Sequence, residues 1–480
     1  MQDCQSRTSD PTREDARATM EPLEARVLMA AQPIVEVRDD ELVVTGTDGA
    51  DQIVVSQTDG EVSLDLNGTT STHPGSFARL TIDGRGGNDV ITLDPTVTAD
   101  AVIHGGAGND SITAGRGNDR LFGGPGVNML FGAGGDDTLV TVGGSTADRL
   151  VGGPGRDAFW LDAGGSEVVN DVTPDEAKGS VNRVSNFHNS KTTATVYTNV
   201  KKTVRVAGKK VTSVQRVATT KVVPAAKHLV GPNLVDPKLS AAATGYTNFR
   251  DRSLFARGGP AGTDVTQGQV GDCYFLAVLS SVAETRPELL RRTIVDLGDG
   301  TFAVRLRRGP ASVYVRVDAD LPTTADGNLA YANFGGGLSL WVPLLEKAWA
   351  AFRTGTGGYA AIDGGWMDES YKALGMAPAS TMTGTGEAVL AAMAAALAAG
   401  KSVTYAVGDP PAGSGLVGFH AYTVDRVTIG ADGKPTSVTL RNPWAVDGHA
   451  SADGADDGFV TIPAGLAGKA MLGFTVGTFA

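Results

Sequence analysis

The chain has 480 residues with a net charge of −12, and it contains 64 glycines and 2 cysteines. This length exceeds the usual size of one domain, so we expect at least two. The acidic balance argues against general nucleic-acid binding, and no apolar run is long enough to span a membrane. With Cys4 near the N-terminus and Cys273 far from it, we expect no structural disulfide and a free thiol at Cys273.

Residues 1–33 are predicted to be a leader, either disordered or used for targeting. The segment Met20–Ala30 resembles the LEPR-xLL segment that opens many large surface or exported proteins of planctomycete-type bacteria, although Ala25 stands where proline is expected. No apolar stretch of signal-peptide length follows its charges. We therefore expect a secreted or cell-surface protein, with the cytoplasm as the alternative.

Residues 34–165 contain a nine-residue repeat. Four contiguous units, GGAGNDSIT, AGRGNDRLF, GGPGVNMLF and GAGGDDTLV, run from Gly105 to Val140, each with Gly fourth, Asp or Asn sixth and an apolar residue eighth. This pattern resembles the RTX repeat of all-β parallel β-rolls, so the eighth residues should point inward. These residues are Ile112, Leu121, Leu130 and Leu139. The alternative is a flexible linker rich in glycine and aspartate.

The resemblance implies that calcium is held between successive coils by aspartate carboxylates and backbone carbonyls. Asn128, which replaces an aspartate, is expected to weaken one site. Such repeats fold at near-millimolar calcium, which points outside the cytoplasm. The candidate ligands are Asp89, Asp110, Asp119, Asp136, Asp137 and Asp157.

Residues 166–244 are predicted to be a basic linker. Between Lys191 and Lys227 there are nine Lys or Arg residues and no acid, and the segment is rich in valine and threonine. A solvated linker is one interpretation, and a β-hairpin docked on the acidic roll is the other. The segment is also a candidate for covering the active-site cleft or for being cut to release a protease.

Cys273 begins an apolar run, Tyr274 to Val282, that is predicted to form a helix. The positive end of a helix dipole favours thiolate over thiol, as a nucleophilic cysteine requires. Gln267, six residues upstream, is placed to direct its amide N–H at an oxyanion near the sulfur. Such a nucleophile needs a histidine and an orienting amide elsewhere in the chain.

His420 and Asn442 are the candidates for these two roles. His420 starts an alternating segment, and Asn442 ends a second strand-like run, with a turn signal at residues 431–434 between them. The two runs are predicted to form a hairpin that holds the imidazole beside the amide. The order Cys, His, Asn and the spacing match papain-like hydrolases.

Four ordered blocks resemble the protease core of the calpain family: Gln-Gly-x-x-Gly-Asp-Cys-Tyr-Phe-Leu from Gln267, Trp341–Trp349, Gly418–Tyr422 and Arg441–Trp444. The resemblance covers residues 245–480 and implies a two-lobed α+β papain-like fold. It places Cys273 in a mainly helical lobe, and His420 and Asn442 in a β-rich lobe. It also implies that Gln267 serves the oxyanion and that Trp444 packs near the catalytic pair.

The resemblance also indicates where this chain departs from the family. Calpain cores bind calcium in each lobe, and Asp264 stands at the first site, but the expected partner carboxylate is Ser339. We expect this site to bind calcium weakly at best. Acids after Asn442 form either a second-lobe calcium site or a solvated loop: Asp447, Asp453, Asp456 and Asp457.

The sequence thus predicts a multidomain protein, with a β-roll followed by a calpain-like cysteine endopeptidase that acts on protein substrates. Calcium is the expected cofactor, and we expect neither a nucleic-acid partner nor a transmembrane segment. The alternatives are a surface adhesion or matrix protein with a non-catalytic calpain-like domain, and an acyltransferase on the same fold. The substrate and the oligomeric state are not indicated by the sequence.

Overall fold

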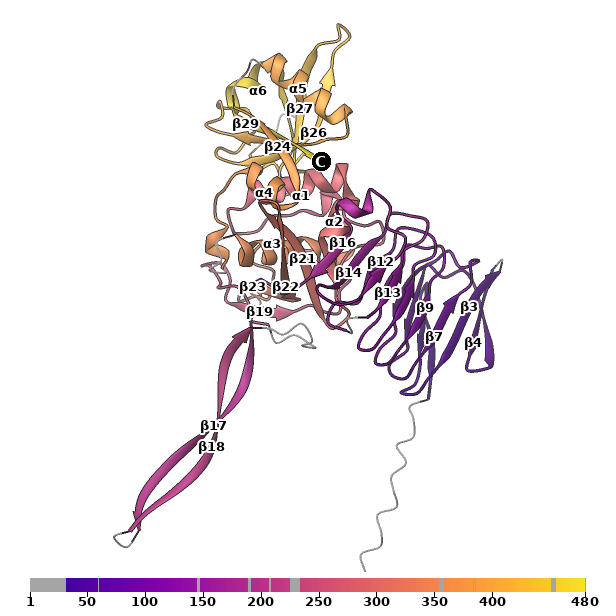
Figure 1. Cartoon of the computed structure of the whole chain (residues 1–480). Helices are drawn as coiled ribbons and strands as arrows, with labels where there is room; N and C mark the ends of the chain where they lie inside the picture. Colours follow the sequence, from indigo (N-terminus) through magenta and orange to yellow (C-terminus); the bar gives the residue numbers. More distant parts are fainter. Residues whose placement is uncertain are drawn as a thin grey trace, which may run out of the picture.

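The computed structural model describes residues 32–58, 60–144, 147–188, 191–206, 209–224, 234–353, 358–382, 384, 386–449 and 455–479, with backbone alone for 191–206 and 209–224. The predicted leader therefore lies outside the described residues, except for its last two positions. The chain is divided into a solenoid, a long hairpin and a two-lobed body (Figure 1).

The first half winds into a β-roll made of two eight-stranded sheets, as the repeats predict. One sheet has the order β1 (Ile34–Arg38), β2 (Glu41–Thr45), β6 (Arg79–Asp83), β8 (Asp100–His104), β10 (Arg120–Phe122), β12 (Thr138–Val140), β14 (Ala158–Asp162), β16 (Val181–Val184). The other has the order β15 (Val168–Val169), β13 (Arg149–Val151), β11 (Met129–Phe131), β9 (Ser111–Thr113), β7 (Val90–Leu93), β3 (Gln52–Thr58), β4 (Glu61–Leu66), β5 (Thr69–Pro74). Strands of successive coils pair in parallel, and antiparallel pairs occur at the N-terminal end.

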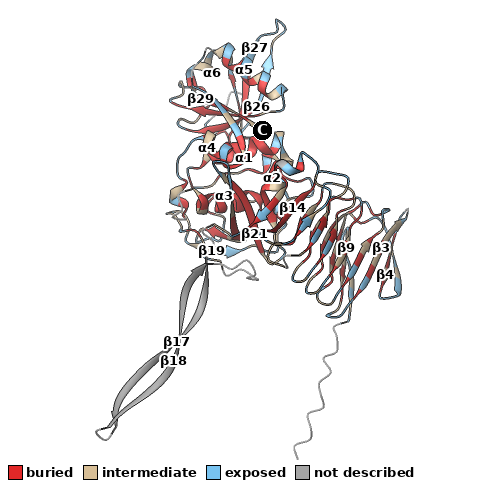
Figure 2. Ribbon diagram, in the orientation of Figure 1, coloured by how far each residue is buried: buried red, intermediate tan, exposed pale blue. Residues whose placement is uncertain are grey.

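The repeat explains how the coils stack. The predicted inward residues Ile112, Leu121, Leu130 and Leu139 are all 0% exposed and form one apolar core between the sheets (Figure 2). At the turns the backbones of adjacent coils touch: a Cβ on Gly126, whose φ is +134°, would lie 1.6 Å from the carbonyl oxygen of Gly108. Only glycine fits such a turn.

The roll is longer than predicted and is docked on the second half of the chain. Its first sheet continues to Val184, beyond the expected boundary at 165, because β16 pairs with β14. The outer face of this sheet packs Phe122, Val140 and Trp160 against Val295 and Ala303 of the second half. The roll and the body therefore share an apolar interface.

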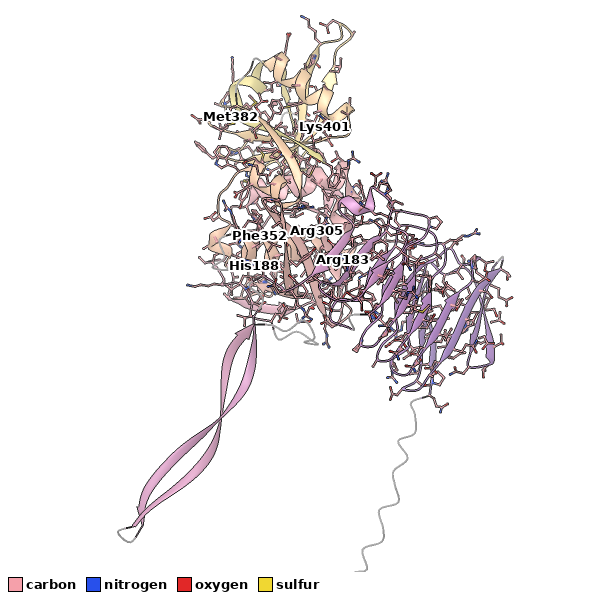
Figure 3. The ribbon with its side chains drawn as sticks, in the orientation of Figure 1. Arg183, His188, Arg305, Phe352, Met382 and Lys401 are labelled. Atoms are coloured by element: carbon pink, nitrogen blue, oxygen red, sulfur yellow. The ribbon has the colours of Figure 1, made fainter. Side chains whose placement is uncertain are left out.

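A buried arginine reinforces the junction. Arg305 lies beside the last coil of the roll (Figure 3). It donates to the carbonyl of Gly179 and, at 2.9 Å, to Oδ1 of Asn182. A salt bridge from Arg120 to Asp296, at 3.3 Å, crosses the same junction.

The predicted basic linker contains a hairpin instead of an irregular segment. Strands β17 (Lys191–Val206) and β18 (Lys209–Pro224) pair antiparallel along their whole length. Figure 1 draws this hairpin reaching away from both the roll and the body, so it does not dock on the acidic roll as the alternative interpretation supposed.

The first lobe of the body packs its helices on a three-stranded antiparallel sheet. Its core is one cluster centred on α1 and α3, and Trp341–Phe352 is the predicted core helix. The helices are α1 (Cys273–Thr285), α2 (Pro287–Thr293), α3 (Trp341–Phe352) and α4 (Met367–Ala373). The strands are β20 (Ile294–Asp296), β21 (Thr301–Arg308) and β22 (Ala311–Asp318), with β19 (Gly245–Asn248) and β23 (Asp320–Thr323) as a separate pair.

The second lobe is a six-stranded antiparallel sheet with two helices. Its order is β24 (Met376–Thr381), β29 (Met471–Phe479), β25 (Ser402–Val407), β26 (Ala421–Ile429), β27 (Pro435–Arg441), β28 (Phe459–Pro463). Helices α5 (Gly386–Ala398) and α6 (Ala464–Ala470) pack on it. The predicted hairpin is the β26–β27 pair. Over the described part of the chain, no helix has the length and apolarity needed to cross a membrane.

Candidate active site and calcium-binding turns

Cys273 is the first residue of α1, where the sequence placed it. Asp272 is the N-cap and makes no side-chain capping bond. The sulfur accepts the backbone N–H of Ala421, the residue that follows His420 in the second lobe. Burial raises the pKa of the Cys273 thiol to about 11, and the nearby Asp272 charge adds to this, against the Ala421 N–H. Burial thus outweighs the helix dipole at this sulfur.

His420 and Asn442 lie side by side, because they precede β26 and follow β27 in the same hairpin. Nε2 of His420 is 2.8 Å from Oδ1 of Asn442, which also accepts the N–H of Trp444 at 3.0 Å. Because that oxygen is an acceptor, Nε2 carries the proton and Nδ1 keeps its lone pair. Burial lowers the pKa of His420 to about 4. The Trp444 ring lies 4.7 Å from the imidazole, where the resemblance placed an indole.

Gln267 connects the cysteine loop to the second lobe. Its backbone N–H donates to the carbonyl of Pro443 at 2.7 Å, next to Asn442 in sequence. Its side-chain Nε2 donates to the carbonyl of Val270 at 2.6 Å, which leaves one amide N–H for another acceptor. The four predicted residues therefore meet at one place, where the two lobes join.

Helix α1 holds the lobes together with its polar side. Thr423 donates to the carbonyl of Ala277 at 2.8 Å, and the Ser281 hydroxyl accepts the N–H of Val403 at 2.9 Å. Arg441 is buried and donates to Ser280 Oγ at 2.9 Å and to the carbonyl of Val265 at 3.0 Å. Because Arg441 directly precedes Asn442, these bonds fix the orienting amide relative to the nucleophile.

A pair of buried carboxyl groups lies beneath the nucleophile, and the sequence analysis missed it. Asp272 and Glu346, 74 residues apart, are 0% and 1% exposed. Burial raises the pKa of both groups, and both side-chain oxygens of Asp272 are buried without a hydrogen-bond donor among the described residues. Glu346, which also accepts the N–H of Ala332, is raised further by the charge on Asp272. We infer that Glu346 keeps its proton and donates it to Asp272, so that the pair carries one negative charge.

The first-lobe calcium position of the family does not fit an ion here. Asp264 accepts N–H groups from Ala261 at 3.0 Å, from Gly336 at 2.7 Å and from the Trp341 indole at 2.8 Å. Ser339, in place of the second carboxylate, is fully buried. With three donors on Asp264, its carboxylate is already satisfied by protein groups.

The acids of the second lobe are arranged in a hydrogen-bonded loop. Asp447 is buried, and its Oδ1 accepts the N–H of Gly458 at 2.9 Å. Its own N–H donates to Asp456 at 2.8 Å. Asp453 lies outside the described residues, so the choice between a calcium site and a solvated loop stays a prediction.

The sixth residues of the repeats form two ladders along the roll. In the first, the N–H of Asp89 donates to Oδ1 of Asp110 at 2.9 Å, and the next coils repeat this bond. In the second, Asp119 donates to Asp137 at 2.8 Å, and Asp137 donates to Asp157 at 2.9 Å. We call them the first ladder (Asp89, Asp110, Asn128, Asp148) and the second ladder (Asp119, Asp137, Asp157).

The second carboxylate oxygen of each ladder aspartate, Oδ2, indicates whether its turn could hold calcium. Within the two ladders, four buried Oδ2 atoms have no hydrogen-bond donor among the described residues, and they belong to Asp89, Asp110, Asp137 and Asp148. A buried anionic oxygen without a donor is what a bound cation would satisfy. Burial raises the pKa of Asp137 to about 9 and that of Asp89 to about 6. Without an ion, the protonated form of these carboxyl groups is therefore more favoured than in water.

The predicted ligands differ in how well they fit. Asp148 was not predicted, because its spacing falls outside the contiguous repeats, and its carboxyl group lies against that of Glu167. Oδ2 of Asp119 accepts the N–H of Gly115 at 3.1 Å. Asp136 lies outside the two ladders, and its Oδ1 accepts the N–H of Arg156 at 2.9 Å.

Comparisons with known proteins agree with this architecture. Residues 246–455 match the calpain family cysteine protease model, and residues 103–139 and 142–165 match the RTX calcium-binding nonapeptide repeat. The second half is a calpain-like cysteine protease domain.

Among the curated relatives of this calpain-like chain, Calpain-12 of Homo sapiens is 32% identical over 197 residues, which cover 38% of this chain and 27% of the relative. The Calpain-2 catalytic subunit of Bos taurus is 34% identical over 131 residues, 26% of this chain and 18% of that protein. The calpain-type cysteine protease DEK1 of Zea mays is 30% identical over 206 residues, 38% of this chain and 9% of that protein. The chain thus spans only a minor part of the length of these relatives.

Proposed function

We propose that this calpain-like domain is an active cysteine endopeptidase with Cys273 as the nucleophile, His420 as the base and Asn442 as the orienting group. The observation that carries the proposal is the 2.8 Å bond between His420 and Asn442 beside a cysteine at a helix N-terminus. A histidine with a purely structural role would need only its hydrogen bond to Asn442. Here the next residue, Ala421, also donates its backbone N–H to the free thiol of Cys273.

The reaction begins with proton transfer from the thiol to Nδ1 of His420. Sγ of Cys273 then attacks the scissile carbonyl carbon, and the carbonyl π electrons move onto oxygen. The backbone N–H of Cys273 and the second amide N–H of Gln267 donate to this oxyanion. Asn442 keeps the imidazole in the required tautomer by accepting from Nε2.

Collapse of the tetrahedral intermediate expels the amine, which takes the proton from His420. The thioester between Cys273 and the acyl part of the substrate remains. His420 next takes a proton from water, the hydroxide attacks the thioester carbon, and the thiol is restored as the acid product leaves. Protein substrates follow from this chemistry, because the bond that is cleaved is a peptide bond.

We assign calcium to the roll and not to the first lobe of the protease. Asp89, Asp110, Asp137 and Asp148 would hold it through their Oδ2 atoms, while Asp264 has no free oxygen for it. When bound, calcium neutralises carboxylates that are otherwise buried close together. Because folding of such turns requires extracellular calcium levels, we also infer that the protein acts outside the cell.

The substitution Cys273→Ala tests the proposal. Casein cleavage should fall at least about a thousandfold, because the covalent step is lost. An epoxide-type thiol inhibitor should label the unaltered protein at Cys273 and leave the variant unlabelled. The far-ultraviolet circular dichroism spectrum should not change, since the side chain is small and ends at the lobe junction.

The second cysteine provides a matched control. Cys4→Ala removes the other thiol of the chain and should leave casein cleavage and inhibitor labelling as they are. Full peptidase activity in the Cys273→Ala variant would overturn the assignment. Labelling at Cys273 with transfer of the acyl group to amines, but no cleavage to acid products, would identify an acyltransferase instead.

A further inference from the structure

One turn of the first ladder carries asparagine where its neighbours carry aspartate. Oδ1 of Asn128 accepts the N–H of Asp110 at 2.9 Å, and its own N–H donates to Oδ1 of Asp148 at 2.6 Å. Asp110 makes the same Oδ1 contact with Asp89. Asn128 therefore occupies the same position as the aspartates, and it is 0% exposed.

Asn128 differs from the ladder aspartates in its second side-chain atom, which is a nitrogen instead of an oxygen. Nδ2 of Asn128 donates to the carbonyl oxygens of Gly124 at 3.0 Å and Gly126 at 3.3 Å. In the preceding turn the corresponding atom, Oδ2 of Asp110, is buried with no hydrogen-bond partner among the described residues. The Asn128 turn satisfies its own polar atoms, and the Asp110 turn does not.

The two kinds of atom occupy equivalent places. A Cβ built on the first glycine of each turn would lie 2.5 Å from Oδ2 of Asp110, measured from Gly105, and 2.8 Å from Nδ2 of Asn128, measured from Gly123. The hydrogen-bond network also fixes which atom is nitrogen. Oδ1 faces an N–H donor, and the other atom faces two carbonyl acceptors, so it must be the amide nitrogen.

We propose that the Asn128 amide substitutes for calcium in its turn. In the aspartate turns, carboxylate and carbonyl oxygens face one another, and a cation is needed to hold them together. In the Asn128 turn, the two amide hydrogens hold the carbonyls of Gly124 and Gly126 directly. This turn forms without calcium, whereas that of Asp110 depends on it.

The Asn128 turn lies at the junction between the roll and the second half of the chain. Gly124 and Pro125 line a cavity of about 450 Å3 together with Leu297, Gly298 and Asp299 of the protease half. Phe122, just before the turn, lies against Gly298. The calcium-independent turn is thus part of the coil that contacts the protease, and this contact persists when calcium is low.

The substitution Asn128→Asp tests the proposal, which depends on the calcium binding proposed for the roll. Calorimetric titration of the full chain with calcium should give one more bound ion than the unaltered protein. The unfolding temperature should fall in chelator and recover in saturating calcium. An unchanged number of ions in a variant that unfolds cooperatively would overturn the proposal. If even the unaltered chain bound no calcium, the roll assignment itself would fail, which is a separate result.

The reciprocal variant does not depend on how well Asn128→Asp folds. Asp110→Asn should bind one ion fewer and unfold at a higher temperature in chelator, because the new amide can donate to its own turn carbonyls. A lower unfolding temperature in chelator would contradict the proposal. Asn109→Asp is the charge control: its Oδ1 accepts the N–H of Val127 at 2.7 Å outside the ladders, so the number of bound ions should not change.

Discussion

At the candidate active site, a half-buried thiol lies against the residue that follows a buried imidazole, and burial acts on the two groups in opposite directions. It raises the pKa of Cys273 to about 11 and lowers that of His420 to about 4. Both shifts favour neutral thiol and neutral imidazole in the closed, substrate-free state. The charge on Asp272 acts in the same direction, because it raises the pKa of the neighbouring thiol.

Alkylation of the free enzyme measures the charge state of this pair. At pH 7 a thiol with a pKa near 11 is thiolate in only about one molecule in 10,000, so iodoacetamide should modify Cys273 slowly. The rate should rise about tenfold per pH unit between 7 and 9. Peptide mass mapping, with Cys273→Ala as the blank, would follow the site. A rate that does not vary between pH 5 and 8 would instead indicate a thiolate–imidazolium pair.

Among the elements, helix α1 both carries Cys273 at its first position and binds the second lobe along its polar side. Its first residue is the proposed nucleophile, and its polar side binds the second lobe through Ser280, Ser281 and the carbonyl of Ala277. The β26–β27 hairpin presents His420 and Asn442 from the opposite side. The distance between nucleophile and base is therefore set by how a helix of one lobe docks on a sheet of the other.

Replacing Arg441 with methionine should disturb this docking. Ser280 Oγ and the carbonyl of Val265 lose their buried donor, which should lower the free energy of unfolding by about 1–3 kcal/mol. Because Asn442 is the next residue, kcat should fall about 10- to 100-fold with little change in KM. Arg426→Met is the control: this arginine of the same sheet is exposed and pairs with its neighbour Asp425, so it should have little effect. An unchanged kcat in Arg441→Met would exclude the positioning role.

The whole molecule joins a solenoid of RTX-type repeats to a calpain-like domain through a packed interface. Trp160 of the roll is fully buried and meets Tyr314 edge-on at 5.9 Å, and Arg305 donates into the last coil. Most of the unsatisfied carboxylates lie in the coils of this same roll. The stability of the roll without calcium should therefore depend on whether these groups are protonated.

The pH dependence of unfolding follows from the raised pKa values. Asp89, Asp119, Asp157 and Asp137 have folded-state pKa values of about 6, 7, 7 and 9, above an unfolded value near 3.8. A raised folded-state pKa gives stability that is complete below 3.8 and is lost as pH rises through the folded value. In chelator, the unfolding temperature of the full chain should therefore fall from about pH 4 to about pH 9, as measured by circular dichroism.

Two comparisons sharpen this measurement. Saturating calcium should flatten the dependence, because the ion takes over the role of the protons. Asp137→Asn removes the group with the highest of these pKa values and should reduce the slope above pH 7. An unfolding temperature that rises with pH in chelator would contradict the assignment of buried, ion-demanding carboxylates.

Local patterns in the sequence were sufficient for much of this architecture. The nine-residue period predicted which residues point into the roll, the apolar run after Cys273 predicted α1, and alternation with a turn predicted the hairpin that carries His420. These features depend on residues close together in the chain, so their geometry follows from backbone period and turn chemistry. The predicted boundary at 165 falls short of Val184, because the last strand pairs with its roll but has no repeat to mark it.

What the sequence determined by itself is the kind of chemistry: a thiol at a helix start, a histidine and an amide on one hairpin, and rows of aspartates on turns. Only the tertiary structure decided which of these groups is already satisfied. Asp264 is bound by N–H donors, Glu346 lies against Asp272, and Asn128 fills its own turn, whereas Asp110 and Asp148 do not. The reason is physical. Whether a buried polar atom has a partner depends on distant segments that meet in space, and no local pattern records that meeting.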